Sequence, residues 1–86
     1  MSFSSSRRNA LDDSKPLVHR ASHARSCAML VAEKWGVPRA TIIDLVRSRC
    51  GVDLNAVSQG AEISTAVAEL ETIRSQGMQP SSEDTD

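Results

Sequence analysis

The chain of 86 residues is poor in the large side chains from which small domains build their cores. It contains one tryptophan, Trp35, one phenylalanine, Phe3, and no tyrosine. A domain of about 60 residues buries only about 60% of the surface that its unfolded chain exposes, so its core is marginal even with aromatic residues. Since the composition suggests neither a metal nor a disulfide as reinforcement, we expect a partner subunit and therefore an obligate homodimer.

Cysteine and long apolar runs are also scarce. Two cysteines, Cys27 and Cys50, are too few for a disulfide scaffold, and we expect a reduced, cytoplasmic protein. No apolar run approaches the roughly 18 residues of a membrane-spanning helix, and residues 1–8 lack the apolar stretch of a secretory signal. A chain this short leaves little room for a substrate cleft. We therefore expect no enzyme, no catalytic residues, and no cofactor or metal site.

The net charge of −1 conceals two halves of opposite sign. Residues 1–50 carry nine Lys or Arg against four Asp or Glu, a balance of +5. Residues 51–86 carry one base, Arg74, against seven acids, a balance of −6. The basic half favours a polyanion such as DNA as its partner, and the acidic half favours a different kind of partner.

The first twenty residues contain an arm and a short extended segment. Residues 1–14 are rich in Ser and Arg without periodicity, which predicts a disordered basic arm. Residues 15–21 are too few for a helix and include the β-compatible Leu17 and Val18, so they predict a strand. Pro16 restricts that strand to an edge or to its own first residue.

Two helices joined by a tight turn are predicted next. Apolar residues recur every three or four positions over 22–35, which predicts an amphipathic helix that ends at Gly36. Pro38 suits the start of a second helix, which is predicted over 39–50 and ends before Gly51.

The acidic half begins after this helix pair. An acidic helical extension is predicted over 52–77, with its helix proper over 61–76, followed by a disordered acidic tail over 78–86. The helix offers a surface for a protein partner through residues 61–77.

The stretch from Val31 to Arg47 reads VAEKWGVPRATIIDLVR: a helix that ends at glycine, a Val-Pro turn, and a second helix with paired aliphatic residues. It resembles the ribbon-helix-helix family of dimeric repressors over residues 15–51. The resemblance implies a mainly α fold with one short strand per chain, in which the strands of two subunits pair as an antiparallel ribbon in the major groove of DNA. Here Pro38 departs from the family's usual Ser or Thr cap, and Pro16 and Arg20 stand where inward apolar residues are usual.

This resemblance implies a DNA-binding surface made of the basic arm, the ribbon and the first turn of the second helix. With Val18 facing inward, the outward ribbon residues would meet base edges, and the helix start would hold phosphate through its free N–H groups. The candidate DNA-binding residues are Arg7, Arg8, Lys15, Leu17, His19, Arg20, Arg39 and Thr41. The function implied is a sequence-specific transcriptional regulator, a bacterial repressor or antitoxin-like protein.

Two other interpretations stay open. The turn is also similar to a helix-turn-helix, with recognition helix 38–50 and the groove-facing residues Arg39, Ala40, Thr41 and Asp44. In that case the five positions that shape the helix-turn-helix motif are held by Ala32, Gly36, Val37, Ile42 and Leu45. The third interpretation is a helical protein-interaction adaptor without affinity for DNA.

Overall fold

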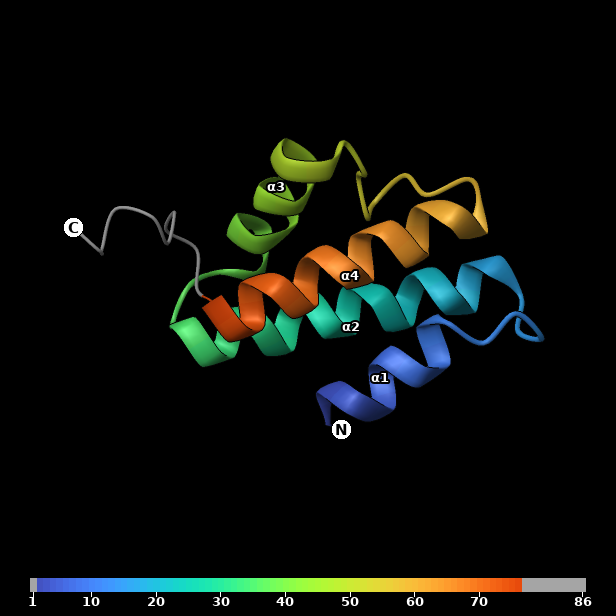
Figure 1. Ribbon diagram of the computed structural model, residues 1–86, viewed down its shortest axis with the longest axis horizontal. Coiled ribbons are helices and arrows are strands. Elements are labelled where there is room, and N and C mark those ends of the chain that lie inside the picture. Colours follow the sequence, from blue (N-terminus) through green and yellow to red (C-terminus); the bar gives the residue numbers. More distant parts are fainter. Residues whose placement is uncertain (1, 77–86) are drawn as a thin grey trace.

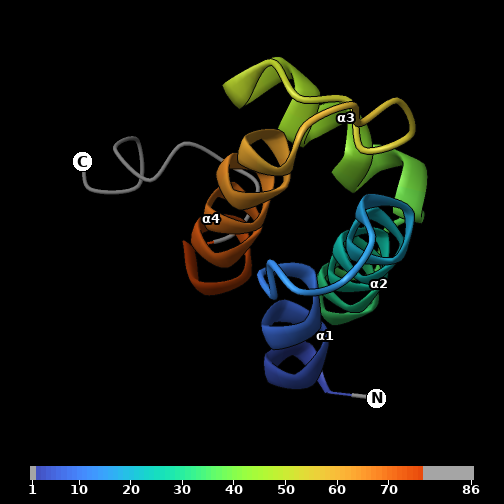
Figure 2. The same ribbon diagram turned by 90° about the vertical axis from the view of Figure 1, so that its right-hand side faces the viewer.

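The computed structural model describes residues 2–76, and over this range it contains four helices and no strand (Figure 1). They are α1 (Phe3–Ala10), α2 (Leu17–Trp35), α3 (Arg39–Cys50) and α4 (Gly60–Gln76). Helix α2 is central, because α1, α3 and α4 all pack against it. Figure 2 shows α1 and α4 beside α2, with α3 lying across α2 and α4. None of these helices is long and apolar enough to cross a membrane.

The predicted ribbon-helix-helix fold is wrong, because the segment predicted as a strand is helical. Pro16 is the N-cap of α2, with φ −59° and ψ 148°. Its carbonyl accepts hydrogen bonds from the N–H groups of His19 and Arg20, each at 3.0 Å. Proline has no N–H to leave unpaired at a helix start, and one β-branched residue, Val18, is too weak a preference to oppose the helix. Residues 2–76 therefore offer no β-ribbon to DNA.

Helix α1 lies where a disordered arm was expected. Ser2 caps it, its Oγ accepting a hydrogen bond from the Ser5 N–H at 3.1 Å. Phe3, Ser6 and Ala10 are buried. Eight residues are too few for an isolated helix, so α1 depends on packing against α2 and α4. The Ser6 hydroxyl is buried with no hydrogen-bond partner among the described residues, which lowers the stability that α1 gains from this packing.

Other boundaries agree with the sequence pattern. The predicted helix 39–50 is confirmed as α3. Gly36 and Gly51 end α2 and α3 in the left-handed conformation, with φ of 70° and 80°. Helix α4 begins one residue before the helix predicted over 61–76, while α2 begins five residues before the one predicted over 22–35. The tail predicted over 78–86 lies outside the described residues.

The core is built mainly from small and aliphatic side chains, which come from all four helices. Alanines along α2 let the neighbouring helices approach closely, and larger aliphatic residues of α3 and α4 fill the space between them. The α2 contribution is Ala21, Ala24, Cys27, Ala28, Val31 and Ala32; the largest fully buried side chains elsewhere are Ile42, Leu54, Ile63, Leu70 and Ile73.

Arg20 is a buried cation that fastens α1 to α2. The residue is 8% exposed, and its Nε donates a hydrogen bond to the carbonyl of Ala10 at 2.8 Å. Its Nη2 lies 3.5 Å from a carboxylate oxygen of Asp13. A Cβ added at Gly60 would lie 2.7 Å from Nη1, so the glycine leaves room for the guanidinium at the start of α4.

The start of α4 is closed by the carboxylate of Glu62. Its Oε1 accepts hydrogen bonds from the backbone N–H groups of Ser58 at 2.8 Å and Gln59 at 3.0 Å, as in a capping box. These bonds to the charged form hold the pKa of Glu62 below its ordinary value of 4.5.

Val18→Asp tests whether the start of α2 is helical, as in the structure, or a strand, as the sequence predicted. In a strand the aspartate would enter the core, but in α2 Val18 is 66% exposed and lies in the first turn of the helix. A negative charge there is favourable, so we expect the free energy of unfolding to stay within about 0.5 kcal/mol of wild type in urea denaturation. Val31→Asp, at a fully buried position of the same helix, should unfold the protein and serves as the matched control. A large decrease in the free energy of unfolding for Val18→Asp would mean that the Val18 side chain is buried in solution.

Arg20→Met tests the fastening of α1. Methionine keeps an unbranched side chain but cannot donate a hydrogen bond to the Ala10 carbonyl. We therefore expect the free energy of unfolding, measured by urea denaturation, to fall by about 1.5–3 kcal/mol. Hydrogen exchange should quicken first in α1. Arg8→Met, at an exposed position of α1, is the control and should change neither measurement. Equal exchange in α1 for both variants would contradict this role for Arg20.

Candidate nucleic-acid interface

The connection between α2 and α3 is a three-residue turn with a defined geometry. The Gly36 N–H donates to the Glu33 carbonyl at 3.3 Å, and the Val37 N–H donates to the Ala32 carbonyl at 3.0 Å. This is the Schellman pattern, and it needs the left-handed conformation that glycine adopts without strain. Pro38 is extended, with ψ 150°, and α3 starts at the next residue. The turn fixes the direction in which α3 leaves α2.

Helix α3 has one buried and one exposed face. Ile42, Ile43 and Val46 are buried. The opposite face, from which polar side chains project, is a continuous strip along the helix, and we call it the α3 face. A shallow, open hollow of about 420 Å³ lies on it, lined by Thr41, Asp44, Leu45 and Ser48. The exposed residues of the α3 face are Ala40, Thr41, Asp44, Arg47 and Ser48. Arg39 is exposed as well, as the first residue of the helix, but it lies on the side of Ile42, Ile43 and Val46.

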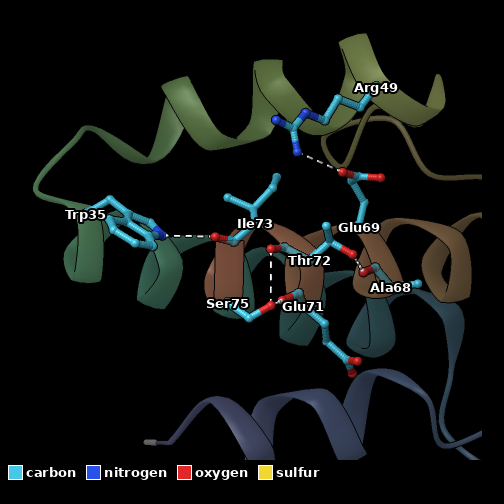
Figure 3. Close-up of polar contacts among 8 residues, drawn as sticks. All are labelled: Trp35, Arg49, Ala68, Glu69, Glu71, Thr72, Ile73 and Ser75. Atoms are coloured by element: carbon cyan, nitrogen blue, oxygen red, sulfur yellow. Dashed lines mark hydrogen bonds and ion pairs between the residues drawn. The ribbon is translucent and has the colours of Figure 1, made fainter. Parts of the chain in front are cut away.

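The arginines near this face are held differently. Arg39 has no hydrogen-bond or ionic partner among residues 2–76. Arg47 Nη2 lies 3.2 Å from Asp44 Oδ1 in an exposed pair on the α3 face. Arg49 Nη1 lies 3.2 Å from Glu69 Oε2, and this pair joins α3 to α4 (Figure 3). Among the arginines of α3, Arg39 is therefore the one that can bind an anion without breaking an ion pair within residues 2–76.

The end of α2 also holds the end of α4. Trp35 Nε1 donates a hydrogen bond to the carbonyl of Ile73 at 3.1 Å (Figure 3). Lys34 Nζ donates to the carbonyl of Arg74 at 2.7 Å. Both carbonyls belong to the last four residues of α4, which lack N–H donors within the helix. These bonds hold α4 against α2, and the Arg49–Glu69 pair holds it against α3.

The predicted ribbon residues lie away from the α3 face. Lys15 precedes α2, and Leu17 and His19 are in its first turn, where Leu17 packs on the core and His19 is exposed. Arg20 is buried and bonded internally. A helix of 19 residues is about 28 Å long, and the turn to α3 is at its other end (Figure 1). The structure does not bring these four residues together with Arg39 and Thr41.

The two arginines of the predicted arm lie on α1. Arg7 forms an ion pair with Glu71 of α4, while Arg8 is exposed. Helix α1 packs on α2 and α4. The eight predicted DNA-binding residues thus divide into a pair on α3 and six on or next to α1 and the start of α2.

Sequence reasoning missed Arg47 and Ser48 as surface residues of the second helix. The signal was present in the helical repeat, since Asp44 is four residues after Ala40, and Arg47 and Ser48 are three and four residues after Asp44, so that all four share a face. The ribbon interpretation drew attention to the helix start and away from the rest of the α3 face.

A second hollow lies between α1 and α4. This α1–α4 groove has a volume of about 540 Å³ and is open to solvent. The Arg74 guanidinium carbon lies 4.7 Å from the centre of the Phe3 ring, and the Arg7–Glu71 pair lies across the groove. Its lining residues are Phe3, Ser4, Arg7, Ala68, Glu71, Thr72, Arg74 and Ser75.

The titratable groups of the core do not form a reactive cluster. Burial raises the pKa of the Cys27 thiol to about 11, which keeps it protonated at neutral pH. Within residues 2–76, no group of three His, Cys, Asp or Glu side chains is arranged to hold a metal ion.

No protein-family model matches the sequence, and the comparisons with curated proteins and with solved structures give no match either.

Trp35→Phe tests the bracing of α4. Phenylalanine keeps most of the ring packing but removes the donor to Ile73, so the free energy of unfolding should fall by about 0.5–1.5 kcal/mol. Urea denaturation followed by circular dichroism measures this, because the variant has no tryptophan fluorescence. Amide resonances over 70–76 should shift as well. Unchanged stability and unchanged resonances would show that the hydrogen bond does not hold the end of α4 in solution.

Proposed function

We propose that this chain is a DNA-binding transcriptional regulator that inserts α3 into the major groove, with α2, the turn and α3 acting as a helix-turn-helix. The observation that carries the proposal is the α3 face, an exposed polar face of a helix whose first residue, Arg39, has no ionic partner within residues 2–76 and which begins just after a Schellman turn. An α-helix fits the major groove, and polar side chains along one face are what reads base edges there.

The packing around the turn supports this arrangement. Ala32 is 2% exposed and lets α2 and α3 approach, and Ile42 is fully buried in the angle between them. Val37 and Leu45 are half-buried and pack on the same core. These residues, with Gly36, hold the five structural positions that the sequence assigned to a helix-turn-helix. Helix α4 contacts both α2 and α3 and supplies the bracing that a preceding helix gives in that motif.

The residue types on the α3 face suit two kinds of contact. Arg39 and Thr41 are in the first turn, where a phosphate meets both a cation and the positive end of the helix dipole. Arg47 can donate to the acceptor edge of guanine, Asp44 can accept from cytosine, and Ser48 can do either. The Asp44–Arg47 pair is exposed, so it exchanges partners at little cost.

The homodimer and the cytoplasmic location belong to this proposal. Helix-turn-helix proteins commonly bind as two-fold dimers to half-sites about 34 Å apart, so we expect a pseudo-palindromic site. The α3 face and the turn are made of residues of one chain.

Arg39→Ala tests the proposal. We expect weaker binding to every duplex and a slope of log K against log salt concentration that is flatter by about one unit, because one phosphate contact is lost. Fluorescence anisotropy with a labelled duplex of mixed sequence, measured from low salt upward, gives both quantities.

The control for this variant is Arg8→Ala, which removes the same charge from α1. It should change the affinity much less and leave the salt slope near the wild-type value. Equal effects of the two variants would indicate attraction by net charge alone and would contradict the assignment of α3. A wild-type protein without affinity for duplex DNA at low salt would refute the proposed function.

The α1–α4 groove favours a second function, the protein-interaction adaptor. It is lined along α4 by residues of the segment 61–77, which the sequence assigned to a protein partner. An adaptor would lack salt-dependent affinity for duplex DNA, so the same titration separates the two functions.

A further inference from the structure

One end of the α1–α4 groove carries a cation that the core holds in place. The guanidinium carbon of Arg74 lies 4.7 Å from the centre of the Phe3 ring, within the range of a cation–π interaction. Phe3 is buried and belongs to the hydrophobic core, so the ring under the guanidinium is itself fixed. A guanidinium placed on a ring loses less side-chain freedom when its N–H edge binds a carboxylate. Arg74 is therefore preorganised to bind an anion.

The charge of Arg74 is not neutralised within the part of the chain that the structure describes. No carboxylate of residues 2–76 forms an ion pair with it. Glu71 is one helical turn away on α4, but its carboxylate extends toward α1 and pairs with Arg7 (Figure 3). The groove is thus lined by two arginines and one glutamate, which gives a net charge of +1. One further carboxylate would neutralise it.

The α4 wall of the groove offers hydrogen-bond acceptors beside this cation. Thr72 Oγ1 donates to the Ala68 carbonyl at 3.2 Å, and Ser75 Oγ donates to the Glu71 carbonyl at 3.0 Å (Figure 3). Because each hydroxyl hydrogen is used within α4, the two oxygens keep lone pairs that can accept from the N–H groups of a ligand. The groove therefore combines donors for a carboxylate with acceptors for amides, which is what a peptide with an acidic side chain requires.

The groove has the length of a short peptide segment. Its α4 wall runs from Ala68 to Ser75, which is about 10 Å at a rise of about 1.5 Å per residue. An extended chain spans about 3.3 Å per residue, so about three residues fit. The groove is open to solvent. That shape suits a segment that enters and leaves it, whereas a small molecule is usually enclosed over most of its surface.

We propose that the α1–α4 groove binds an extended acidic segment of a partner protein, with one Asp or Glu carboxylate of that segment on the Arg74 guanidinium. Glu71 keeps the net charge of the groove at +1, which matches a single carboxylate and disfavours a phosphate group with a charge near −2. The inference names the partner of the adaptor and rests on that second function. It does not depend on DNA binding by α3.

Binding is tested by NMR titration of the isotope-labelled full chain at low salt. The probe is the peptide acetyl-GAEAG-amide, and the matched control is acetyl-GAQAG-amide, which has a similar shape and no charge. We expect saturable amide shifts at Phe3, Ser4, Ala68 and Ser75, with an affinity about threefold to tenfold higher for the glutamate peptide. Equal affinities would overturn the role of the carboxylate, and shifts confined to α3 would overturn the assignment to the groove.

Arg74→Gln tests the residue that binds the carboxylate. This variant should lose the preference for the glutamate peptide over the glutamine peptide. Arg8→Gln, at an exposed position of α1 outside the groove lining, loses the same charge and should keep the preference. Equal losses in the two variants would attribute the preference to net charge and overturn the proposal.

A second variant should gain affinity, which a loosened α1 cannot produce. Glu71→Gln raises the net charge of the groove by one and releases Arg7, so the glutamate peptide should bind about threefold to tenfold more tightly. Glu33→Gln, at an exposed position of α2 outside the lining, makes the same change of net charge and should leave the affinity nearly unchanged. If Glu71→Gln binds the peptide no more tightly than Glu33→Gln does, the proposal is wrong.

Further probes separate this inference from the adaptor function on which it rests. If acetyl-GAKAG-amide shifts the groove residues as strongly as the glutamate peptide, the groove is an adaptor surface and the acidic partner is wrong. If none of the three peptides shifts them, the adaptor function of the groove fails together with the inference. If inorganic phosphate shifts them at a lower concentration than the glutamate peptide, the ligand is a phosphate group and the acidic segment is wrong.

Discussion

The fold depends on the close approach that α2 permits to its three neighbours. Its buried face is made of alanines, a cysteine and a valine, so each neighbouring helix can lie near its backbone and bury large aliphatic side chains against it. With one tryptophan and one phenylalanine in the whole chain, close packing of small groups replaces the area that aromatic residues usually bury. The other elements are arranged around this helix, including the turn that carries α3.

The four helices are not held equally. Helices α3 and α4 bury isoleucine, leucine and valine, and they are joined by the Arg49–Glu69 pair and by bonds from the end of α2. Helix α1 buries little apolar surface besides Phe3 and includes an unsatisfied hydroxyl, so its attachment relies on polar contacts through Arg7, Arg20 and Arg74. The region around the α3 face is therefore the firmer part of the molecule, which suits a surface that must present side chains in fixed positions.

Local signals gave correct predictions where one residue decides the backbone. Gly36 and Gly51 ended their helices, and Pro38 preceded α3, because the φ values that these residues permit are properties of the residues themselves. The same kind of signal was misread at Pro16. A proline that begins a helix and a proline that begins an edge strand look alike in a short window, and the resemblance to a ribbon protein favoured the strand.

The sequence by itself thus determined where α3 and α4 lie, how α2 ends, and that the basic and acidic charges are separated along the chain. Only the tertiary structure decided that α1 is a helix, since a segment of eight residues, six of them polar, gains its stability from α2 and α4 and not from its own propensity. It also decided that Arg20 is inside and Val18 outside. Burial depends on which face of a helix meets a neighbour, and for the first turns of α2 that was set by the docking of α1 and the start of α4, which no pattern within residues 15–21 records.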